Sequence, residues 1–133
     1  MVGLLIVTHC NLGKELLNAA EFIVGHMASA EAVSIDQISD SEEILRNIKA
    51  RIAALDNGQG VLILTDMFGG TPSNLSLSFL KKEMVEVLTG VNLPMIIAVV
   101  QNRSVMKLSE LAEMIQEAGK KSISLAGKLL ESV

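Results

Sequence analysis

The sequence contains few aromatic residues and a single cysteine. Its 133 residues include no Trp, no Tyr and three Phe, although half of the chain is hydrophobic. The core must therefore be built from aliphatic side chains and Met. Cys10, being alone, cannot form a disulfide within the chain, which fits the reducing conditions of the cytosol. We expect one domain spanning residues 1–133, since a chain of this length can bury a core of its own.

The chain also lacks an excess of positive charge and any long hydrophobic run. Its formal net charge is −4, which argues against a general nucleic-acid binder because phosphate binding needs a surplus of Lys and Arg. No apolar run approaches the roughly 20 residues of a membrane span, and no signal peptide is recognisable. We therefore expect a soluble cytoplasmic protein that holds any anionic ligand locally, through loop amides or helix N-termini.

Short aliphatic runs alternate with longer amphipathic stretches along the chain. The aliphatic runs predict strands over residues 2–7, 32–35, 61–64 and 84–89. The amphipathic stretches predict helices over residues 12–24, 42–55, 72–80, 94–100 and 105–117. Ser39 or Ser41 is placed to cap the second helix, while Gly25 and Gly119 are placed to end the first and the last. A short apolar alternation at residues 122–125 suits one additional strand at a sheet edge, before a small terminal helix.

This alternation predicts an α/β fold with an open, mainly parallel four-stranded sheet and helices on both faces. Right-handed crossover connections favour the strand order 2-1-3-4. In that order the chain reverses direction between the first and third strands, and ligands bind in the crevice beyond their carboxyl ends. His9 follows the first strand and Asp66 follows the third. Both side chains are therefore expected at this crevice.

Two short stretches, IVTHC at residues 6–10 and TDMFGGTPSN at residues 65–74, could carry chemistry. Taken alone, His9 is either a core-edge histidine satisfied by a backbone group or a functional residue in the crevice. Gly69 and Gly70 let the backbone approach a ligand closely. Thr71 is placed to cap the helix begun by Pro72, and Ser73 lies in its first turn. A capped turn alone would be ordinary; its coincidence with His9 and Asp66 favours an anion site.

A histidine, a carboxylate and an anion-binding turn suit phosphoryl transfer. A histidine that accepts a phosphoryl group must be neutral, with its attacking ring nitrogen unprotonated. A carboxylate that accepts a hydrogen bond from the other nitrogen holds that tautomer in place. Amides and hydroxyls of the turn can stabilise the oxygens of the phosphoryl group during in-line transfer.

Three stretches, GLLIVTHCNLGKELLNAAEFIVG, GVLILTDMFGGTPSN and TGVNLPM, follow one another in this order. In them the chain closely resembles the IIA component of the mannose/fructose/sorbose family of the bacterial phosphoenolpyruvate-dependent sugar phosphotransferase system. The resemblance covers essentially the whole chain. It implies a cytoplasmic homodimer that takes a phosphoryl group from the phosphocarrier HPr and passes it to a IIB component. We expect no cofactor, and no metal site, because no second His or Cys stands near enough in the pattern to form a zinc site with His9.

The resemblance also implies roles for individual residues. His9 would be phosphorylated at Nε2, and Asp66 would be the carboxylate partner of Nδ1. The phosphoryl group would be held by Gly69, Gly70, Thr71 and Ser73. Some members of the family exchange their C-terminal strand in the dimer, so residues 120–133 are expected at the interface. Cys10 departs from the family, which commonly has Gly after the histidine.

Several alternatives stay open at this point. The same fold and phosphohistidine could serve a donor of the dihydroxyacetone-kinase type or a regulatory role, or the crevice could bind a small anion without covalent chemistry. Cys10 could be a nucleophile with His9 as its base, whereas His26 reads as a solvated residue in a surface turn. Met67 and Phe68 beside the site suit either a docking patch for partner proteins or core packing.

Overall fold

Four parallel strands form the centre of the molecule. The computed structural model describes residues 1–37, 40–67 and 69–131. The strands are β1 (Gly3–His9), β2 (Ala30–Ile35), β3 (Val61–Thr65) and β4 (Val85–Thr89). All neighbouring pairs are parallel, and the order is β2-β1-β3-β4. The predicted α/β fold and its strand order are thus confirmed.

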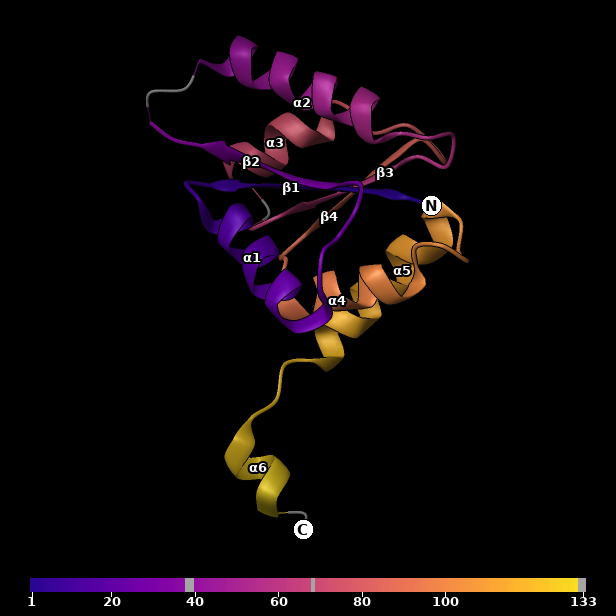
Figure 1. Ribbon diagram of the computed structural model, residues 1–133. Helices are drawn as coiled ribbons and strands as arrows, with labels where there is room; N and C mark the ends of the chain where they lie inside the picture. Colours follow the sequence, from indigo (N-terminus) through magenta and orange to yellow (C-terminus); the bar gives the residue numbers. More distant parts are fainter. Residues whose placement is uncertain (38–39, 68, 132–133) are drawn as a thin grey trace.

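Helices cover both faces of the sheet (Figure 1). On one face lie α1 (Leu12–Val24), α4 (Leu93–Asn102) and α5 (Leu108–Lys121). On the other face lie α2 (Ser41–Leu55) and α3 (Thr71–Leu77). A short helix, α6 (Ala126–Glu131), stands apart from this body at the end of a C-terminal arm. Among the described residues, no helix is both long and apolar enough to span a lipid bilayer.

The two central strands read as unbroken aliphatic runs because both of their faces are buried. All side chains of residues 4–7 and 61–64 are fully inaccessible to solvent. Successive side chains of a strand point to opposite faces. Leu4 and Ile6 therefore pack with the α1, α4 and α5 side, while Leu5 and Val7 pack with the α2 and α3 side. Runs of this kind are typical of parallel sheets covered on both faces.

Local capping differs from the prediction at the second helix. The N-cap of α2 is Asp40, whose carboxylate accepts the backbone N–H of Glu42 at 3.4 Å. Ser41 is the first helical residue, and Ser39 lies outside the described residues. The first helix ends as predicted, because Gly25 adopts a φ of 88° and its N–H reaches the carbonyl of Glu21 at 2.9 Å.

The end of the chain is where the sequence-based expectation was wrong. Gly119 does not end α5; it is buried inside the helix, and a Cβ there would lie 2.6 Å from Sδ of Met95. The glycine thus permits close contact between α5 and α4. Residues 123–125 form no strand in this chain, because the arm leads away from the sheet edge toward α6.

A buried arginine holds the start of β1 in place. Arg103, at the end of α4, is only 3% exposed. Its guanidinium donates to the carbonyls of Val2, Ala28 and Ser29 at 2.9, 2.8 and 2.6 Å. Burial lowers the pKa of this group from its ordinary value. The three hydrogen bonds tie the first strand and the loop before β2 to the α4 side of the sheet.

Candidate active site

His9 and Asp66 meet where β1 and β3 end, at the point where the strand order reverses. Nδ1 of His9 lies 2.7 Å from Oδ2 of Asp66. The same oxygen accepts the backbone N–H of His9 at 2.9 Å, and Oδ1 accepts the N–H of Met67 at 3.0 Å. The carboxylate is thus held by two backbone amides as well as by the ring. The structure brings these two predicted residues together.

The two partners differ in exposure, which matters for their electrostatics. The side chain of His9 is 47% exposed and that of Asp66 only 12%. Burial by itself would raise the pKa of the Asp66 carboxyl, but hydrogen bonds from the backbone and ring of His9 together bring this pKa below its ordinary value. Asp66 is therefore ionised at neutral pH. Because a carboxylate only accepts, Nδ1 carries the proton of the neutral ring and Nε2 keeps a free lone pair.

The glycine turn lies against the ring of His9. A Cβ built on Gly70 would lie 3.0 Å from Cε1 of His9 and 3.6 Å from Nε2. Gly69 adopts a φ of 84°, a left-handed conformation that favours glycine. These positions allow the turn to approach the side of the ring that carries the unprotonated nitrogen.

Thr71 shares a hollow with His9. The hollow has a volume of about 410 Å³, and its other lining residues come from the ends of β1 and β2 and the start of α2. Thr71 is not the cap that the sequence predicted, since Gly70 takes the N-cap position and Thr71 is the first residue of α3. Its exposed side chain lines the hollow and is accessible to a ligand.

Ser73 lies in the first turn of α3 as predicted, but its hydroxyl points into the fold. The residue is fully buried. Its Oγ lies 2.5 Å from the carbonyl of Met67 and 2.5 Å from Oγ1 of Thr65. The expected contact between this hydroxyl and a phosphoryl group therefore has no support in the geometry.

Two buried threonines beside the site were missed by the sequence reasoning. Thr8 and Thr65 are fully buried at the carboxyl ends of β1 and β3. Oγ1 of Thr8 accepts the N–H of Gly13 at 2.7 Å and so fastens the start of α1 to β1. The available signal was that each is the first polar residue after an aliphatic run, directly before His9 and Asp66 respectively.

Two further candidates from the sequence are Cys10, which lines the hollow beside His9, and His26. Cys10 is exposed, has a φ of 49° and donates its N–H to the carbonyl of Ile35 at 2.7 Å. A Cys–His nucleophile pair gains no support, because Nδ1 of His9 is bonded to Asp66. His26 is 86% exposed and pairs with Glu21 at 3.0 Å.

The apolar residues beside the site are only partly described. Met67 is 56% exposed, so it is not a core residue and the docking interpretation is retained for it. Phe68 lies outside the described residues.

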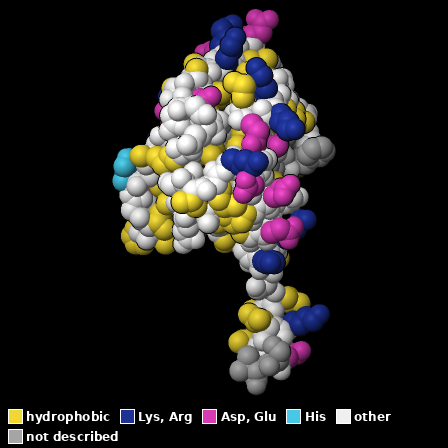
Figure 2. All heavy atoms as spheres, turned by 90° about the vertical axis from the view of Figure 1, so that its right-hand side faces the viewer, with side chains coloured by type: hydrophobic (Ala, Val, Ile, Leu, Met, Phe, Trp, Pro, Cys, Tyr) yellow, Lys and Arg dark blue, Asp and Glu magenta, His cyan; other side chains and the backbone are white. Residues whose placement is uncertain are grey.

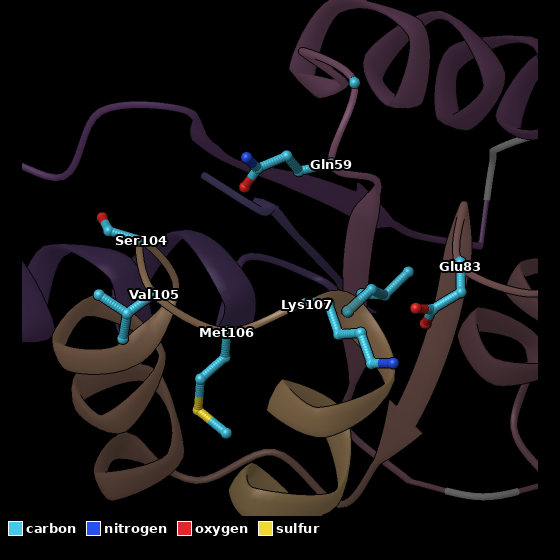
Figure 3. A pocket seen from close by; sticks show the side chains of 8 residues that line it. Gln59, Glu83, Ser104, Val105, Met106 and Lys107 are labelled. Atoms are coloured by element: carbon cyan, nitrogen blue, oxygen red, sulfur yellow. The ribbon is translucent and has the colours of Figure 1, made fainter.

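A second hollow, of about 400 Å³, lies at the opposite, amino end of the strands (Figure 3). Gln59, Glu83, Ser104 and Lys107 are among its lining residues. The carboxylate of Glu83 accepts the N–H of Ser109 at 2.9 Å and so caps the start of α5. Among the residues that the structure describes, this lining includes no histidine or cysteine. In the described ranges of the chain, no group of three or more His, Cys, Asp or Glu side chains could hold a metal ion.

Comparisons with known proteins agree with this fold. A family model described as "PTS system fructose IIA component" matches residues 3–116. The chain is 30% identical over 92% of its length to the PTS system mannose-specific EIIAB component of Escherichia coli (strain K12), and it spans only 38% of that protein. It is 28% identical to the PTS system sorbose-specific EIIA component of Lacticaseibacillus casei, with 95% of this chain and 92% of that protein covered.

Solved structures share the fold. The PTS IIA protein associated with the fucose utilization operon of Streptococcus pneumoniae aligns with a TM-score of 0.86 and 26% identity, over 98% of this chain and 99% of that one. The mannose/sorbose-specific IIA subunit of Enterococcus faecalis aligns with a TM-score of 0.84 and 26% identity, over 93% of both chains. The matched family model and these relatives lead to one conclusion: the chain belongs to the mannose/fructose/sorbose family of IIA components of the sugar phosphotransferase system.

Proposed function

We propose that His9 carries a phosphoryl group on Nε2, accepting it from HPr and passing it to a IIB component. The observation that supports this most directly is the contact of 2.7 Å between Nδ1 of His9 and Oδ2 of Asp66. A carboxylate on Nδ1 leaves Nε2 as the nucleophile. The exposure of His9 lets this nitrogen meet the phosphorylated side chain of a partner protein.

The phosphoryl group moves from a ring nitrogen of the HPr histidine to Nε2 of His9. The lone pair of Nε2 attacks the phosphorus of the phosphohistidine on HPr. The new N–P bond forms as the old one breaks, and its electron pair returns to the histidine of HPr. The ring of His9 gains positive charge during this step, while its proton stays on Nδ1. The negative charge of Asp66 stabilises the charged ring, because the two groups are in direct contact.

The turn after Asp66 is suited to hold the transferred group. Gly70 offers a backbone surface beside Nε2, where a Cβ would be only 3.6 Å away. Thr71 adds a side-chain hydroxyl in the hollow shared with His9. We expect these two groups to contact the oxygens of a phosphoryl group on Nε2. In delivery to a IIB component, a nucleophile of that component attacks the phosphorus, the N–P bond to Nε2 breaks, and its electron pair returns to the ring of His9.

Incubation with phosphoenolpyruvate, enzyme I and HPr, followed by intact mass measurement, tests the proposal. We expect the mass to rise by one phosphoryl group, and the label to be lost in acid, as phosphohistidine is. His9→Ala should abolish the increase. His26→Ala is the matched control, because His26 is an exposed histidine outside the site and its loss should leave labelling unchanged. Labelling that persists in His9→Ala would contradict the assignment.

The same measurement addresses the alternatives that the sequence left open. An unchanged mass, under conditions that label a known IIA protein, would favour a crevice that binds a small anion without covalent chemistry. Labelling without delivery to any IIB component would favour a regulatory role or a donor of the dihydroxyacetone-kinase type.

We also propose that the chain forms a homodimer through its C-terminal arm, residues 122–131. The arm exposes apolar side chains, and Figure 2 shows it projecting from the body. Ile123 is 80% exposed, Leu125 74%, Leu129 58% and Leu130 70%. So much exposed apolar surface on a short segment favours a protein partner.

The free edge of β4 is the surface that best suits the arm of a second copy. β4 is the last strand of the sheet, and two hollows that share Leu88 and Gln116 run between it and α5. Lys81 pairs with Val85 at the start of this edge, through hydrogen bonds of 2.9 and 3.1 Å. An extended segment from a partner could continue the sheet beyond that point, as edge strands commonly allow.

Light scattering on the full-length chain tests the dimer. We expect a dimer for the parent protein and a shift toward monomer for Leu125→Asp, which places a charge on the apolar alternation of the arm. Ser124→Asp is the matched control, since neighbouring residues of a strand point to opposite faces. A monomeric parent at micromolar concentration would overturn the dimer, and equal behaviour of the two variants would overturn the strand-like role of the arm.

A further inference from the structure

Two buried hydroxyl groups, of Thr65 and Ser73, are hydrogen-bonded to each other next to Asp66, the carboxylate partner of His9. We propose that Thr65 and Ser73 are positioning residues, which hold the Asp66 carboxylate and the glycine turn in register with His9. This inference rests on the proposed phosphohistidine function, and it assigns the Ser73 hydroxyl a role different from direct phosphoryl binding. Both residues are fully buried, so their hydroxyls exchange no hydrogen bonds with solvent.

The direction of the hydrogen bonds follows from the chemistry of the groups. The carbonyl of Met67 can only accept, so the single hydroxyl proton of Ser73 is donated to it at 2.5 Å. Thr65 must then donate its own proton to Oγ of Ser73, also at 2.5 Å. The chain therefore runs one way, from Thr65 through Ser73 to Met67, and every member is satisfied. A fully satisfied buried network is rigid.

Asp66 lies between the two ends of this chain. Thr65 precedes it and Met67 follows it, and both are tied to Ser73. The N–H of Met67 meanwhile donates to Oδ1 of Asp66 at 3.0 Å. The backbone N–H of Met67 is thus bonded to Asp66, and its carbonyl is bonded to Ser73. A rotation of this residue would turn the Asp66 carboxylate away from Nδ1 of His9.

The same serine links the carboxylate to the turn. Ser73 is the third residue of α3, which begins at Thr71 directly after Gly70. Gly70 lies so close to the ring of His9 that an added Cβ would be 3.0 Å from Cε1. One buried side chain therefore holds both the partner of Nδ1 and the backbone beside Nε2. The two sides of the histidine ring are kept in a single geometry.

The test compares Ser73→Ala with Ser76→Ala in the full-length protein. Ser76 is the matched control, because it is also a fully buried serine of α3 and donates at 2.6 Å to the carbonyl of Pro72, away from Asp66. We measure the ring ¹⁵N shifts of His9 at neutral pH, which report the Nδ1–H fraction, and the rate of phosphorylation by HPr. For Ser73→Ala we expect a lower Nδ1–H fraction and a rate about tenfold lower. Ser76→Ala should match the parent in both.

Thr65→Val provides a second variant in case Ser73→Ala does not fold. It removes the first donor of the chain and leaves the bond from Ser73 to Met67, so we expect a smaller change in the same direction. Parent-like tautomer and rate in Thr65→Val and in a folded Ser73→Ala would overturn the proposal. Equal losses in Ser73→Ala and Ser76→Ala would also overturn it. The tautomer measurement needs no phosphoryl donor, so it remains informative even if His9 is never phosphorylated.

Discussion

Two carboxylates at opposite ends of the sheet share one electrostatic property and differ in their surroundings. Burial would raise the pKa of Asp66, but hydrogen bonds from His9 bring it below its ordinary value. Hydrogen bonds from Ser109 likewise lower the pKa of Glu83, chiefly through the serine side chain. Asp66 contacts a histidine ring at 2.7 Å, whereas Glu83 caps a helix. The lowered pKa alone therefore does not mark a site; the group that the carboxylate holds does.

Substitution of Asp66 and substitution of Glu83 should differ most in their effect on phosphoryl transfer. In Asp66→Asn, the amide can offer its NH₂ to the ring and favour the wrong tautomer. We expect transfer from HPr to slow by at least about 10²-fold, by analogy with orienting carboxylates in other enzymes. Rapid-quench kinetics would measure the rate. A parent-like rate would mean that Asp66 is only a local cap, as Glu83 is.

The next effect concerns the turn beside the ring. Gly70 has a φ of −82°, so Ala is allowed by the backbone, but its Cβ would lie 3.0 Å from Cε1 of His9. We expect Gly70→Ala to displace the ring from Asp66 and to lower the transfer rate about tenfold, with the fold retained. Gly127→Ala, on the arm with open space around it, is the matched control. Equal rates in the two variants would show that close approach of the turn is not needed.

A smaller effect should appear in the pH dependence of stability. The pKa of Asp66 is lower in the folded protein than in the unfolded chain, where Asp has a pKa of about 3.9. Its stabilising contribution is therefore complete above that value and is lost as the pH falls through the folded pKa. Urea unfolding between neutral pH and about pH 3 should show a smaller acid-induced loss of free energy in Asp66→Asn. Parallel curves for variant and parent would contradict this linkage.

The smallest effect is expected at the amino end of the sheet. Glu83→Ala removes the carboxylate that accepts the N–H of Ser109 at the start of α5. We expect a slight decrease in Tm and no change in the rate of transfer from HPr. Calorimetry and the kinetic assay used for Asp66→Asn would measure both. A slowed transfer would show that the two ends of the sheet are coupled, and the contrast between the two carboxylates would then fail.

The parts of the site that were predictable are those that topology alone determines. Parallel strands place their carboxyl ends at one edge, and the order β2-β1-β3-β4 makes β1 and β3 neighbours. His9 and Asp66 had to lie near each other once this order was inferred. The burial of the Ser73 side chain was not predictable, because position in a helix turn does not show whether a side chain faces the crevice or the core.

The sequence by itself determined the alternation of strands and helices, the family and the positions of His9 and Asp66, because burial on both faces demands aliphatic strands and polar residues mark their ends. Tertiary packing decided what local patterns could not. Gly119 lies inside α5, where a residue with a Cβ would clash with Met95 of α4. The predicted strand at residues 122–125 is absent because pairing needs a segment that runs along a sheet edge, whereas the arm of this chain leads away from the sheet toward α6. Such contacts depend on residues far apart in the chain, and no local pattern contains them.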